Sequence, residues 1–505
     1  MSTESKALKK CIISGFQLEY VEELIRECRN ELDVKLVIVH PDQYQLAVER
    51  LSPIPVLNRF DSRNGIFDTL DSTVTPKVVD RNIREYYSAH LETSLVMFSR
   101  MDGDGWTISC DERLRVFWDT VVTWEAFVEQ NEIELFISRE IPHFPSEYLL
   151  ARVCERYSAK VIMSEFIEYL ERRRLVTSID DRSYDIRSDV EPSNLEDARK
   201  LIERINKHYK EAVSTWISSF NLKNRETGFL NFLRSSIYLL AYGVYKLGKE
   251  RSGINIALNR KKWTQDPSRL AIAWYFFKAR RRIMHLRRFY RNMCSEDLSL
   301  PEKYIYFAPN YQPEMTTVPD GNGFHNMVEV LKLLHACLPQ GWKIIYKEHP
   351  ATFKVPYKIF FRGHMMRSEQ FFKELALDNV LIFPPEFDSF ELIDRSQFIV
   401  SVNGTILLES VARGKNAIMF GNAWHEALPG VKKISMKSEL DDYLQTEGWK
   451  QEIDRNRLAY ALATLQEDTI PLLMLMKKRV QKRDFVASEI DIFSVKLREI
   501  INEDT

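Results

Sequence analysis

The strongest constraint on the fold is a repeated alternation of short apolar runs and helical patterns between residues 304 and 402. In chain order, the strand-like and helical segments alternate at 304–308, 324–338, 342–346, 368–377, 380–383, 389–395 and 398–402. Such units build a parallel sheet, because each helix returns the chain to the same edge. Ligands of parallel sheets collect outside the carboxyl ends of the strands. Residues that follow these strands are therefore the first candidates for a functional site.

A second alternation opens the chain. A strand pattern at 10–15 precedes helical spacing at 21–32 and a strand at 34–39, and further strands at 133–138 and 160–164 flank a helical pattern at 147–156. A chain of 505 residues exceeds what one hydrophobic core usually supports. The sequence therefore predicts an α/β protein with two Rossmann-like domains facing a cleft.

The domain boundaries follow from where the strand signals stop and resume. We expect an N-terminal Rossmann-like domain at 1–170, a helical insertion in it at 171–300, a second Rossmann-like domain at 301–470 and a C-terminal helix at 471–505 that crosses back. Within the insertion, Ser193 and Glu196 form a capping box ahead of a helix at 198–220.

Composition excludes several classes of protein. The 71 basic and 72 acidic residues nearly cancel, which removes any global electrostatic reason to expect a nucleic-acid binder. The six cysteines show no CxxC pair or metal-ligand spacing and are expected to be reduced core thiols. The N-terminus has no signal-peptide pattern, and the apolar stretch 229–247 is interrupted by Arg234 and Lys246. A cytoplasmic protein is expected, with 229–247 a buried or interfacial helix.

The turn after the strand at 398–402 is suited to a phosphate. Gly404 lets the backbone approach a ligand, Asn403 and Thr405 supply polar side chains, and the helix that follows offers free amides. Glu409 lies one turn further on the same face, where its carboxylate could accept from ribose hydroxyls. The alternative is an ordinary strand-to-helix turn.

Two further loops carry candidate chemistry. His349, followed by Pro350, ends the strand at 342–346 and could donate to a departing phosphate, with Lys347 beside it; the alternative is a structural histidine. Glu314 follows Gln312 and a proline after the strand at 304–308, where a carboxylate could serve as a nucleophile or a base. The alternative is a solvated loop glutamate.

Taken together, these motifs resemble the capsule polysaccharide biosynthesis family, which includes the bacterial Kdo transferases. The segments that carry the resemblance are Gln312-Pro313-Glu314, His349-Pro350, the run from Phe387 to Ile393, Asn403-Gly404-Thr405, and Gly414-Lys415 leading to Phe420-Gly421. The resemblance covers about residues 304–430 and extends more faintly to Ile141-Pro142-His143, which places His143 on the acceptor side.

The resemblance implies a GT-B glycosyltransferase that uses a CMP-linked sugar, with an acceptor-side domain at 1–170 and a nucleotide-sugar-binding domain at 301–470. By it, Glu314 is the essential carboxylate, His349 contacts the donor phosphate, and Gln312 and Lys347 belong to the donor site. It further implies that Asn403, Gly404 and Thr405 hold the same phosphate and that Glu409 holds the ribose. The acceptor would be a surface polysaccharide or a lipid-linked oligosaccharide.

The sequence departs from the family pattern at Trp424-His425-Glu426, where members often carry an aromatic residue after the tryptophan. His425 could reach the cleft, and the alternative is an exposed loop histidine. Asp388 is a candidate second catalytic acid, but with Glu391 three residues later it is also a good helix N-cap.

No metal or other cofactor is expected. Asp102-Gly103-Asp104 resembles a metal-binding carboxylate pair, but Gly105 follows and a tight hairpin turn explains it better. When a CMP-sugar reacts, CMP leaves as a monophosphate, and helix amides and a histidine can stabilise that anion without a metal. Gly321-Asn322-Gly323 lacks the third glycine of a dinucleotide fingerprint, so a dehydrogenase is not favoured.

A basic helical segment runs from Lys278 to Arg291 with aromatic residues between its cations. It is either a solvated face or a docking surface. The docking partner would be an anionic membrane surface, namely the inner face of the cytoplasmic membrane, or an anionic glycan.

For the whole chain two rival functions stay open, namely a transferase that uses UDP or GDP sugars and a catalytically silent protein that binds glycan or acts as a scaffold.

Overall fold

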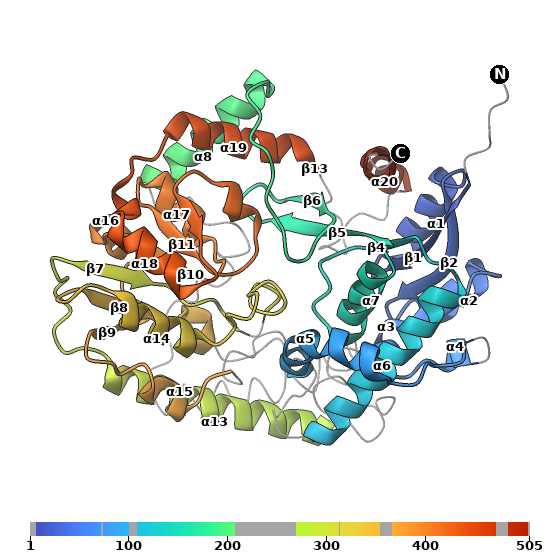
Figure 1. Ribbon diagram of the computed structural model, residues 1–505, viewed down its shortest axis with the longest axis horizontal. Coiled ribbons are helices and arrows are strands. Elements are labelled where there is room, and N and C mark those ends of the chain that lie inside the picture. Colours follow the sequence, from blue (N-terminus) through green and yellow to red (C-terminus); the bar gives the residue numbers. More distant parts are fainter. Residues whose placement is uncertain are drawn as a thin grey trace. The chain divides into compact units, whose positions relative to one another are not determined.

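The computed structural model describes residues 7–71, 74–99, 109–207, 269–312, 314–353, 366–470 and 483–502 (Figure 1). These residues form two compact units. The first holds the described residues up to Ser178 and those from Asp468 onward, and the second holds those from Ile179 to Glu467. Each unit is built on a mainly parallel sheet covered by helices. The predicted α/β class with two Rossmann-like domains is therefore confirmed.

The first unit contains a sheet that has seven strands among the described residues. They are β1 (Lys9–Ser14), β2 (Leu32–Val39), β3 (Val56–Asn58), β4 (Leu135–Ser138), β5 (Lys160–Ile167), β6 (Arg172–Val176) and β13 (Thr469–Ile470). Their order is β13-β6-β5-β4-β1-β2-β3. The five neighbouring strands β5, β4, β1, β2 and β3 pair in parallel. β6 and β13 extend the sheet with antiparallel pairs. The order reverses between β1 and β4, as it does in dinucleotide-binding folds.

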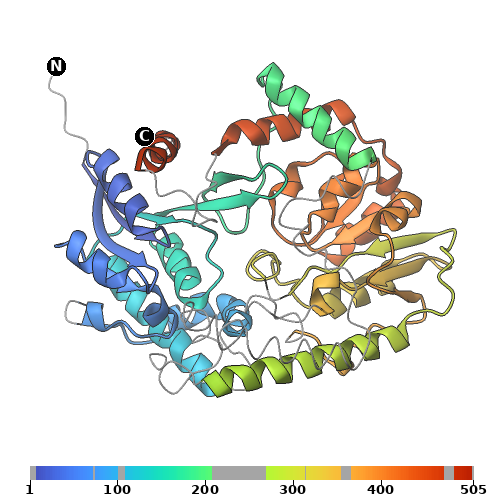
Figure 2. The same ribbon diagram turned by 180° about the vertical axis from the view of Figure 1, so that it is seen from behind.

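Helices cover the first sheet. They are α1 (Leu18–Glu27), α2 (Tyr44–Arg50), α3 (Arg59–Arg63), α4 (Asp68–Asp71), α5 (Arg81–Phe98), α6 (Cys110–Gln130), α7 (Pro145–Arg156) and the C-terminal α20 (Arg483–Asn502). Figures 1 and 2 both show α20, in red, beside α1, in blue. The buried Phe493 and Leu497 of α20 join the core that holds Phe16, Leu24 and Cys28. The C-terminal helix thus returns to the first unit.

The second unit contains a fully parallel sheet that has six strands in the described part of the chain. They are β7 (Tyr304–Phe307), β8 (Lys343–Lys347), β9 (Val380–Phe383), β10 (Ile399–Ser401), β11 (Ala417–Met419) and β12 (Val431–Lys433). Their order is β12-β11-β10-β7-β8-β9. All four residues of β7 are buried, as expected for a central strand with both faces covered.

The helices of the second unit include two from the predicted insertion. The α-helices are α8 (Pro192–Lys207), α13 (Arg269–Met293), α14 (Met327–Cys337), α15 (Glu369–Lys373), α16 (Ser389–Arg395), α17 (Ile406–Ala412), α18 (Lys437–Gln445) and α19 (Arg455–Asp468). Short 3₁₀ turns occur at η1 (Pro350–Phe353), η3 (Trp424–Ala427) and η4 (Gly448–Lys450). Asn326 caps α14 by accepting from the Val328 amide at 3.1 Å.

The described residues of the predicted 171–300 insertion are shared between the two units instead of forming one attached to the first. β6 is an unexpected strand of the first sheet, whereas α8 and α13 pack on the second unit (Figures 1 and 2). The reason is that an amphipathic helix needs a surface for its apolar stripe. Leu201 and Ile205 of α8 and Ile283 of α13 are buried there. Ser193 lies inside α8, so the helix begins earlier than the capping box predicted.

Several sequence predictions fall on residues 100–108 and 208–268 and so lie outside the described residues. These include the Asp102-Gly103-Asp104 turn, most of the helix expected at 198–220 and the apolar stretch 229–247. The cysteines are free thiols, and Cys11, Cys28 and Cys154 are buried as predicted, but Cys110 is exposed at the start of α6. Among the described helices, none is both long and apolar enough to cross a membrane.

Packing of α20 on α1 can be tested with a pair of variants in one helix. Leu497 is fully buried, whereas Val495 is 52% exposed. We expect Leu497→Ala to lower the free energy of unfolding of the first unit by about 2–5 kcal/mol, because it removes buried methyl groups and leaves a cavity. Val495→Ala should change it by less than about 0.5 kcal/mol. Denaturant titration measures both, and equal effects would contradict the observed packing.

Candidate functional site

The strand order of the second sheet defines where a ligand would bind. β7 lies between β8 and β10, and the order of the strands reverses at the β7–β10 pair. In open parallel sheets, the crevice at the carboxyl ends of such a pair is the usual ligand site, because the two following loops diverge there. The loops after β7, β8 and β10 carry Glu314, His349 and Gly404, respectively.

A buried amide network joins the loops after β7 and β10. The Asn310 side chain donates to the Asn403 side chain at 2.7 Å, and Ser401 Oγ donates to the Ala308 carbonyl at 2.9 Å. Asn403 Nδ2 in turn donates to the Asp320 carbonyl at 3.2 Å. Asn310, Ser401 and Asn403 are all buried. The side chain of Asn403 therefore holds loops together, which leaves the following backbone as the part of this turn that a ligand could approach.

Glycines allow these loops to pack closely. A Cβ at Gly421, in the loop after β11, would lie 2.4 Å from the Asp320 carbonyl oxygen. The neighbouring Asn422 amide donates to that same oxygen at 2.6 Å. At Gly404 a Cβ would lie 3.0 Å from Ser401 Oγ. Only a residue without a side chain fits at Gly421, because a fixed carbonyl occupies the space.

Lys347 places a buried positive charge at the carboxyl end of β8. Its side chain is 5% exposed, and Nζ donates to the Phe387 carbonyl at 3.0 Å and to Ser389 Oγ. Burial lowers the pKa of Lys347 to about 8, against the opposing influence of Asp388 and Glu409. The ammonium is thus largely charged near neutral pH. It is held by the segment that follows β9, and the Glu409 carboxylate on α17, after β10, favours its charged form.

The ring of His349 is oriented by a backbone amide two residues further along the chain. Its Nδ1 accepts from the Ala351 amide at 3.2 Å, so a neutral ring carries its proton on Nε2 and can donate there. The ring is partly exposed and lies 5.7 Å, centroid to centroid, from the ring of Tyr311 in the loop after β7. This contact brings the loops after β7 and β8 together.

A buried ion pair supports the His349 loop. The fully buried carboxylate of Glu348 accepts from Arg367 Nε at 2.6 Å and Nη2 at 3.2 Å, and from the Tyr346 hydroxyl at 2.9 Å. Burial alone would raise the pKa of Glu348, but Arg367 and these hydrogen bonds hold it below its usual value. The carboxylate therefore stays ionised and fixes the backbone next to His349.

Gln312 connects this ion pair to the loop that carries Glu314. Its Oε1 accepts from Arg367 Nη1 at 2.5 Å, and its Nε2 donates to the His325 carbonyl at 2.7 Å. The side chain is only 3% exposed. Gln312 thus has buried protein partners on both ends of its amide, and it fits a residue that positions the loop better than one that contacts a donor directly.

Glu314 itself begins a hydrogen-bonded turn. Its carbonyl accepts from the Thr317 amide at 3.1 Å and from Thr317 Oγ1 at 2.9 Å. Glu314 is partly exposed, so a substrate can reach it, while Thr317 is buried. Pro313 lies outside the described residues.

The remaining candidates of the second unit lie at helix starts. Asp388 caps α16 by accepting from the Phe390 amide at 2.8 Å, so the capping interpretation is confirmed. Thr405 occupies the N-cap position of α17 without a side-chain cap bond, and Glu409 is partly exposed on that helix. Because α17 has only seven residues, positive charge for an anion comes mainly from Lys347.

Two predicted histidines lie elsewhere. His143 belongs to the first unit, after β4. The alternative of an exposed loop for His425 was wrong, since it is 2% exposed and its ring stacks on Trp424 at 3.9 Å between centroids. Burial lowers the pKa of His425 to about 3, which keeps the ring neutral. The 3₁₀ turn η3 folds the imidazole inward instead of leaving it in a loop.

Several arginines on the basic face of α13 contact other residues of the second unit. Arg287 and Arg291 both pair with Glu386, at 3.1 and 2.8 Å, and Arg282 donates to the Arg367 carbonyl at 3.1 Å. Arg280 is 3% exposed. Part of the charge that the sequence assigned to a solvated or membrane-docking face thus stabilises the packing of this helix.

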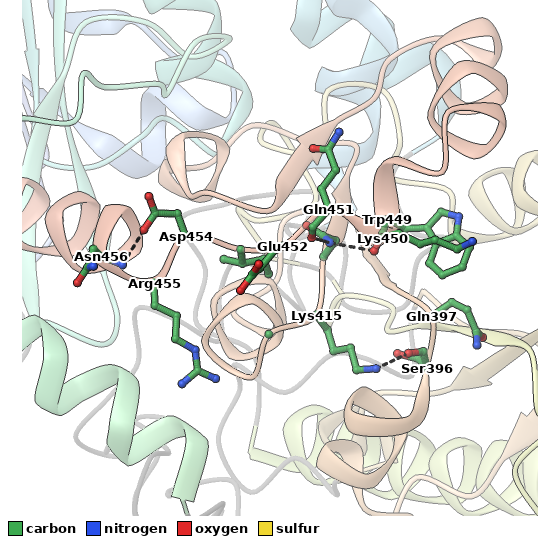
Figure 3. A pocket seen from close by; sticks show the side chains of 13 residues that line it. Ser396, Gln397, Lys415, Trp449, Lys450, Gln451, Glu452, Asp454, Arg455 and Asn456 are labelled. Atoms are coloured by element: carbon green, nitrogen blue, oxygen red, sulfur yellow. Dashed lines mark hydrogen bonds between the residues drawn. The ribbon is translucent and has the colours of Figure 1, made fainter.

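A cavity of about 930 Å³ lies at the opposite edge of the second sheet. Asn416, which directly precedes β11, is one of its lining residues. Figure 3 shows Gln397, which lies two residues before β10, together with Trp449 and Arg455 around it. It contains none of the predicted site residues, and the amino ends of parallel strands are not where such folds bind their ligands.

The described residues contain no cluster of three or more His, Cys, Asp or Glu side chains suited to a metal ion.

Sequence reasoning missed the residues that hold the loops in place. Asn310, Arg367, Asp320 and Asn422 act through partners that are distant in sequence, so no local pattern marks them. Glu348 lies inside the Lys-Glu-His-Pro motif, and a glutamate at the end of a buried strand was a signal that it needs a cationic partner.

Comparison with known proteins adds distant structural likeness. No family model and no curated protein matches the sequence. A UDP-GlcNAc 2-epimerase from Methanocaldococcus jannaschii is 10% identical, with a TM-score of 0.25 over 91% of this chain and 99% of that one. MurG of Acinetobacter baumannii is 8% identical, with a TM-score of 0.23 over 96% and 100%. KpsC of Thermosulfurimonas dismutans, a beta Kdo 2,7 transferase, is 12% identical, with a TM-score of 0.26 over 74% and 89%. Scores this low carry no argument about function.

The Glu348–Arg367 pair gives a stability test of the site. Arg367→Leu should lower the free energy of unfolding of the second unit by about 3–5 kcal/mol, because it leaves a buried carboxylate without its cation. The double variant Arg367→Leu, Glu348→Leu should recover part of the loss. Lys332→Ala removes the exposed pair with Glu374 and should cost less than about 1 kcal/mol. A double variant as unstable as the single one would contradict this assignment.

Proposed function

We propose that the chain is a glycosyltransferase that moves an acidic sugar, Kdo or another ulosonic acid, from a CMP donor to a hydroxyl of a surface polysaccharide or lipid-linked oligosaccharide. The observation that carries the proposal is the buried ammonium of Lys347 at the carboxyl end of β8, the strand next to β7 in a six-stranded parallel sheet. At the same edge, a hydrogen bond joins the loops after β7 and β10, and a ring contact joins those after β7 and β8. The choice of CMP and of an acidic sugar rests on the sequence resemblance.

The donor phosphate would bind at Lys347, His349 and the backbone of Gly404 and Thr405. An ammonium and an imidazole N–H both favour an anion, and they do so most when they are fixed before the reaction. As the bond between the sugar and the phosphate breaks, the phosphate takes the bonding electron pair and gains charge. Lys347 and His349 Nε2 would stabilise that charge, and Glu409 would accept from the ribose hydroxyls.

Glu314 would act on the sugar. For a reaction with retention its carboxylate attacks the anomeric carbon, and the acceptor hydroxyl then displaces it; for inversion it takes the proton of the acceptor hydroxyl. In either case the Gln312–Arg367–Glu348 chain of hydrogen bonds holds the loop beside Glu314, so little reorganisation is needed.

A Glu314→Gln variant tests the assigned carboxylate. We expect transfer from CMP-Kdo to fall by at least about a thousandfold, because an amide can neither attack nor accept a proton, while CMP binding stays within about twofold. Glu302→Gln, at an exposed position ahead of β7, is the matched control and should retain full activity. Unchanged turnover by the Glu314 variant would remove this residue from the mechanism.

The pKa of Lys347 predicts a pH dependence for nucleotide binding. Above a pH of about 8 the ammonium loses its proton, so CMP affinity should fall by about tenfold or more between pH 7 and pH 10. In Lys347→Arg the charge persists over this range, and the fall should disappear. Calorimetric titration at several pH values measures both, and identical profiles for the two proteins would exclude Lys347 from phosphate binding.

The same titrations distinguish the nucleotide base. Tighter binding of CMP than of UMP or GMP supports the proposed donor, whereas preference for UDP or GDP favours a transferase for those sugars. A protein that binds CMP tightly but neither hydrolyses CMP-Kdo nor transfers its sugar would be a binding protein.

A further inference from the structure

The cavity at the amino edge of the second sheet has the size and lining of a binding site. Its volume of about 930 Å³ lies near the upper end of the range of about 300–1,000 Å³ that small-molecule sites occupy. Its lining comes from the segments before β10 and β11 and from residues 449–456, all within the second unit. Figure 3 shows Lys415, Trp449 and Asn456 around it.

A buried asparagine holds the walls of the cavity together. Asn416 is 6% exposed, and its Nδ2 donates to the Trp449 carbonyl at 2.9 Å and to the Gln451 carbonyl at 2.7 Å. The backbone carbonyl of Asn416 accepts from the Ile399 amide of β10 at 3.1 Å. A shift of the 449–451 segment would leave a buried amide without its acceptors, which costs free energy. The cavity is therefore preformed.

Trp449 gives the cavity an aromatic wall. Its ring meets that of Trp342, which directly precedes β8, edge to face with centroids 5.3 Å apart, and both rings pack against the hydrophobic core. The Lys450 ammonium, which pairs with Glu447, lies 5.0 Å from the centroid of the Trp449 ring. Trp449 stays partly exposed at the cavity. An anchored indole of this kind offers an apolar face to the C–H groups of a sugar ring and an N–H to a hydroxyl.

Lys415 adds a half-buried cation to the wall. Its Nζ donates to the Ser396 carbonyl at 2.9 Å, and burial lowers the pKa of Lys415 against the influence of Asp394. Asp394 itself pairs with Arg413, and no carboxylate in the described part of the chain lies within ion-pair distance of the Lys415 ammonium. An ammonium has three N–H donors, so Lys415 can donate to a ligand while it keeps its bond to Ser396.

The exposed side chains of the lining suit hydroxyl groups. They are those of Gln451, Glu452 and Asn456. An amide both donates and accepts, and a carboxylate accepts from more than one donor. Sugar hydroxyls, each of which donates and accepts, match this mixture better than a purely apolar molecule or a bare anion does.

The charged groups of the lining favour a sugar that carries an acid. The lining holds three cations and two carboxylates. One carboxylate, that of Asp454, already accepts from two backbone amides at the start of α19, at 2.9 and 3.0 Å. Lys415 and the exposed Arg455 are then the cations that a ligand carboxylate would meet, and a charge-assisted hydrogen bond to a half-buried ammonium is stronger than one at an open surface.

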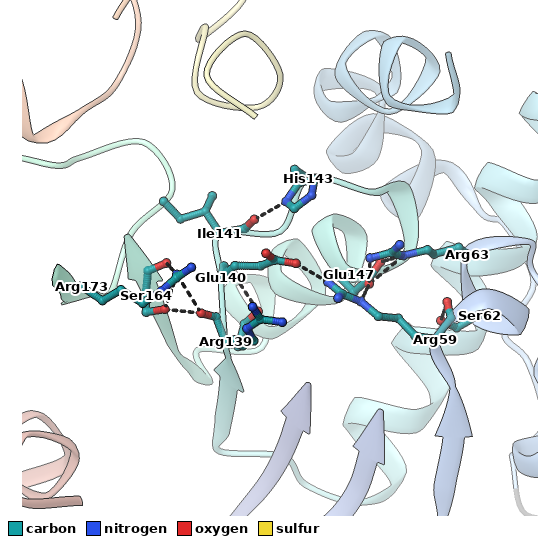
Figure 4. Close-up of polar contacts among 11 residues, drawn as sticks. Arg59, Ser62, Arg63, Arg139, Glu140, Ile141, His143, Glu147, Ser164 and Arg173 are labelled. Atoms are coloured by element: carbon teal, nitrogen blue, oxygen red, sulfur yellow. Dashed lines mark hydrogen bonds and ion pairs between the residues drawn. The ribbon is translucent and has the colours of Figure 1, made fainter. Parts of the chain in front are cut away.

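A buried ionic cluster of the first unit shows the opposite arrangement. Glu147 is 1% exposed and accepts from Arg59 Nε and from Arg63 Nη2 at 2.8 Å, and Glu140 accepts from Arg59 Nη2 at 2.7 Å. Figure 4 shows Glu147 between the two guanidinium groups. Those cations are paired inside the fold, as buried cations usually are. Lys415 differs because it is held by a neutral carbonyl at the wall of a cavity.

We infer that this cavity binds a segment of an acidic oligosaccharide, with a sugar carboxylate at Lys415 and a sugar ring against Trp449. The assignment rests on the proposed function, because a glycan that receives ulosonic acids is an oligosaccharide of this class. Lys347 and His349 follow the carboxyl end of β8, whereas the cavity lies at the amino edge of the same sheet. A glycan held here would stay close to the enzyme between transfers without taking part in the chemistry.

The test uses the full chain and three probes, namely trigalacturonate, the neutral trisaccharide maltotriose and the non-sugar anion citrate. Ligand-detected NMR titrations measure the affinity of each. We expect trigalacturonate to bind at least about tenfold more tightly than either of the others, because it alone offers both hydroxyls and a carboxylate. Lys415→Gln should remove the preference over maltotriose, whereas Lys373→Gln, an exposed lysine of α15, should leave it unchanged.

Variants of Trp449 test the aromatic wall. Trp449→Ala should weaken trigalacturonate at least about tenfold, and Trp449→Phe, which keeps a ring, should lose less. The bond from Asn416 goes to the backbone carbonyl of residue 449, so it persists in both variants. Citrate binding as tight as that of trigalacturonate would overturn the inference. So would trigalacturonate binding that is unchanged in Lys415→Gln and Trp449→Ala, or that is displaced by CMP.

The failure of this site and the failure of the proposed function give different results. A protein that transfers sugar from CMP-Kdo but shows no binding of trigalacturonate would refute the glycan site alone. A protein that binds trigalacturonate through Lys415 and Trp449 but never transfers sugar would instead count against the proposed function.

Discussion

The hydrogen bond between the side chains of Asn310 and Asn403 is the contact on which the candidate site depends. It joins the loops after β7 and β10, which would otherwise diverge where the strand order reverses. Both amides are buried, so an unpaired partner would cost free energy comparable to a lost buried hydrogen bond. Because the Asn403 amide also reaches the carbonyls of Asp320 and Asn422, one side chain fixes three loops at once.

Buried hydrogen bonds also position the charge of the site. Lys347 sits on the last residue of β8, where the strand geometry fixes its backbone, and its ammonium is held by Phe387 and Ser389 at the start of α16. Neighbouring Glu348 points to a different partner, Arg367, because successive side chains on a strand alternate between faces. These two adjacent charged residues therefore have different roles. Lys347 lies near the polar loops at the edge of the sheet, and Glu348 stabilises the loop that carries His349.

Much of the second unit was predictable, because its strands are short apolar runs that need no distant partner to be recognised. The strands expected at 342–346 and 380–383 correspond to β8 and β9, and the cap at Asp388 was visible as an Asp with a Glu three residues later. The role of α13 was not predictable. Its cations looked like a solvated or membrane-facing surface, but Arg287 and Arg291 meet Glu386 from a loop almost a hundred residues away. Pairing of this kind depends on tertiary packing that local periodicity does not encode.

The carboxyl edges of the two sheets both carry buried cations. At the carboxyl edge of the second sheet, Asp388 and Glu409 favour the charged form of Lys347, but burial outweighs them and lowers its pKa to about 8. At the same edge of the first sheet, burial and the charge of Arg139 lower the pKa of Arg173 to about 10, against the opposing influence of Glu140 and Glu168. Since the desolvation of a cation is costly, nearby carboxylates in both units offset only part of it, and both side chains stay largely protonated near neutral pH.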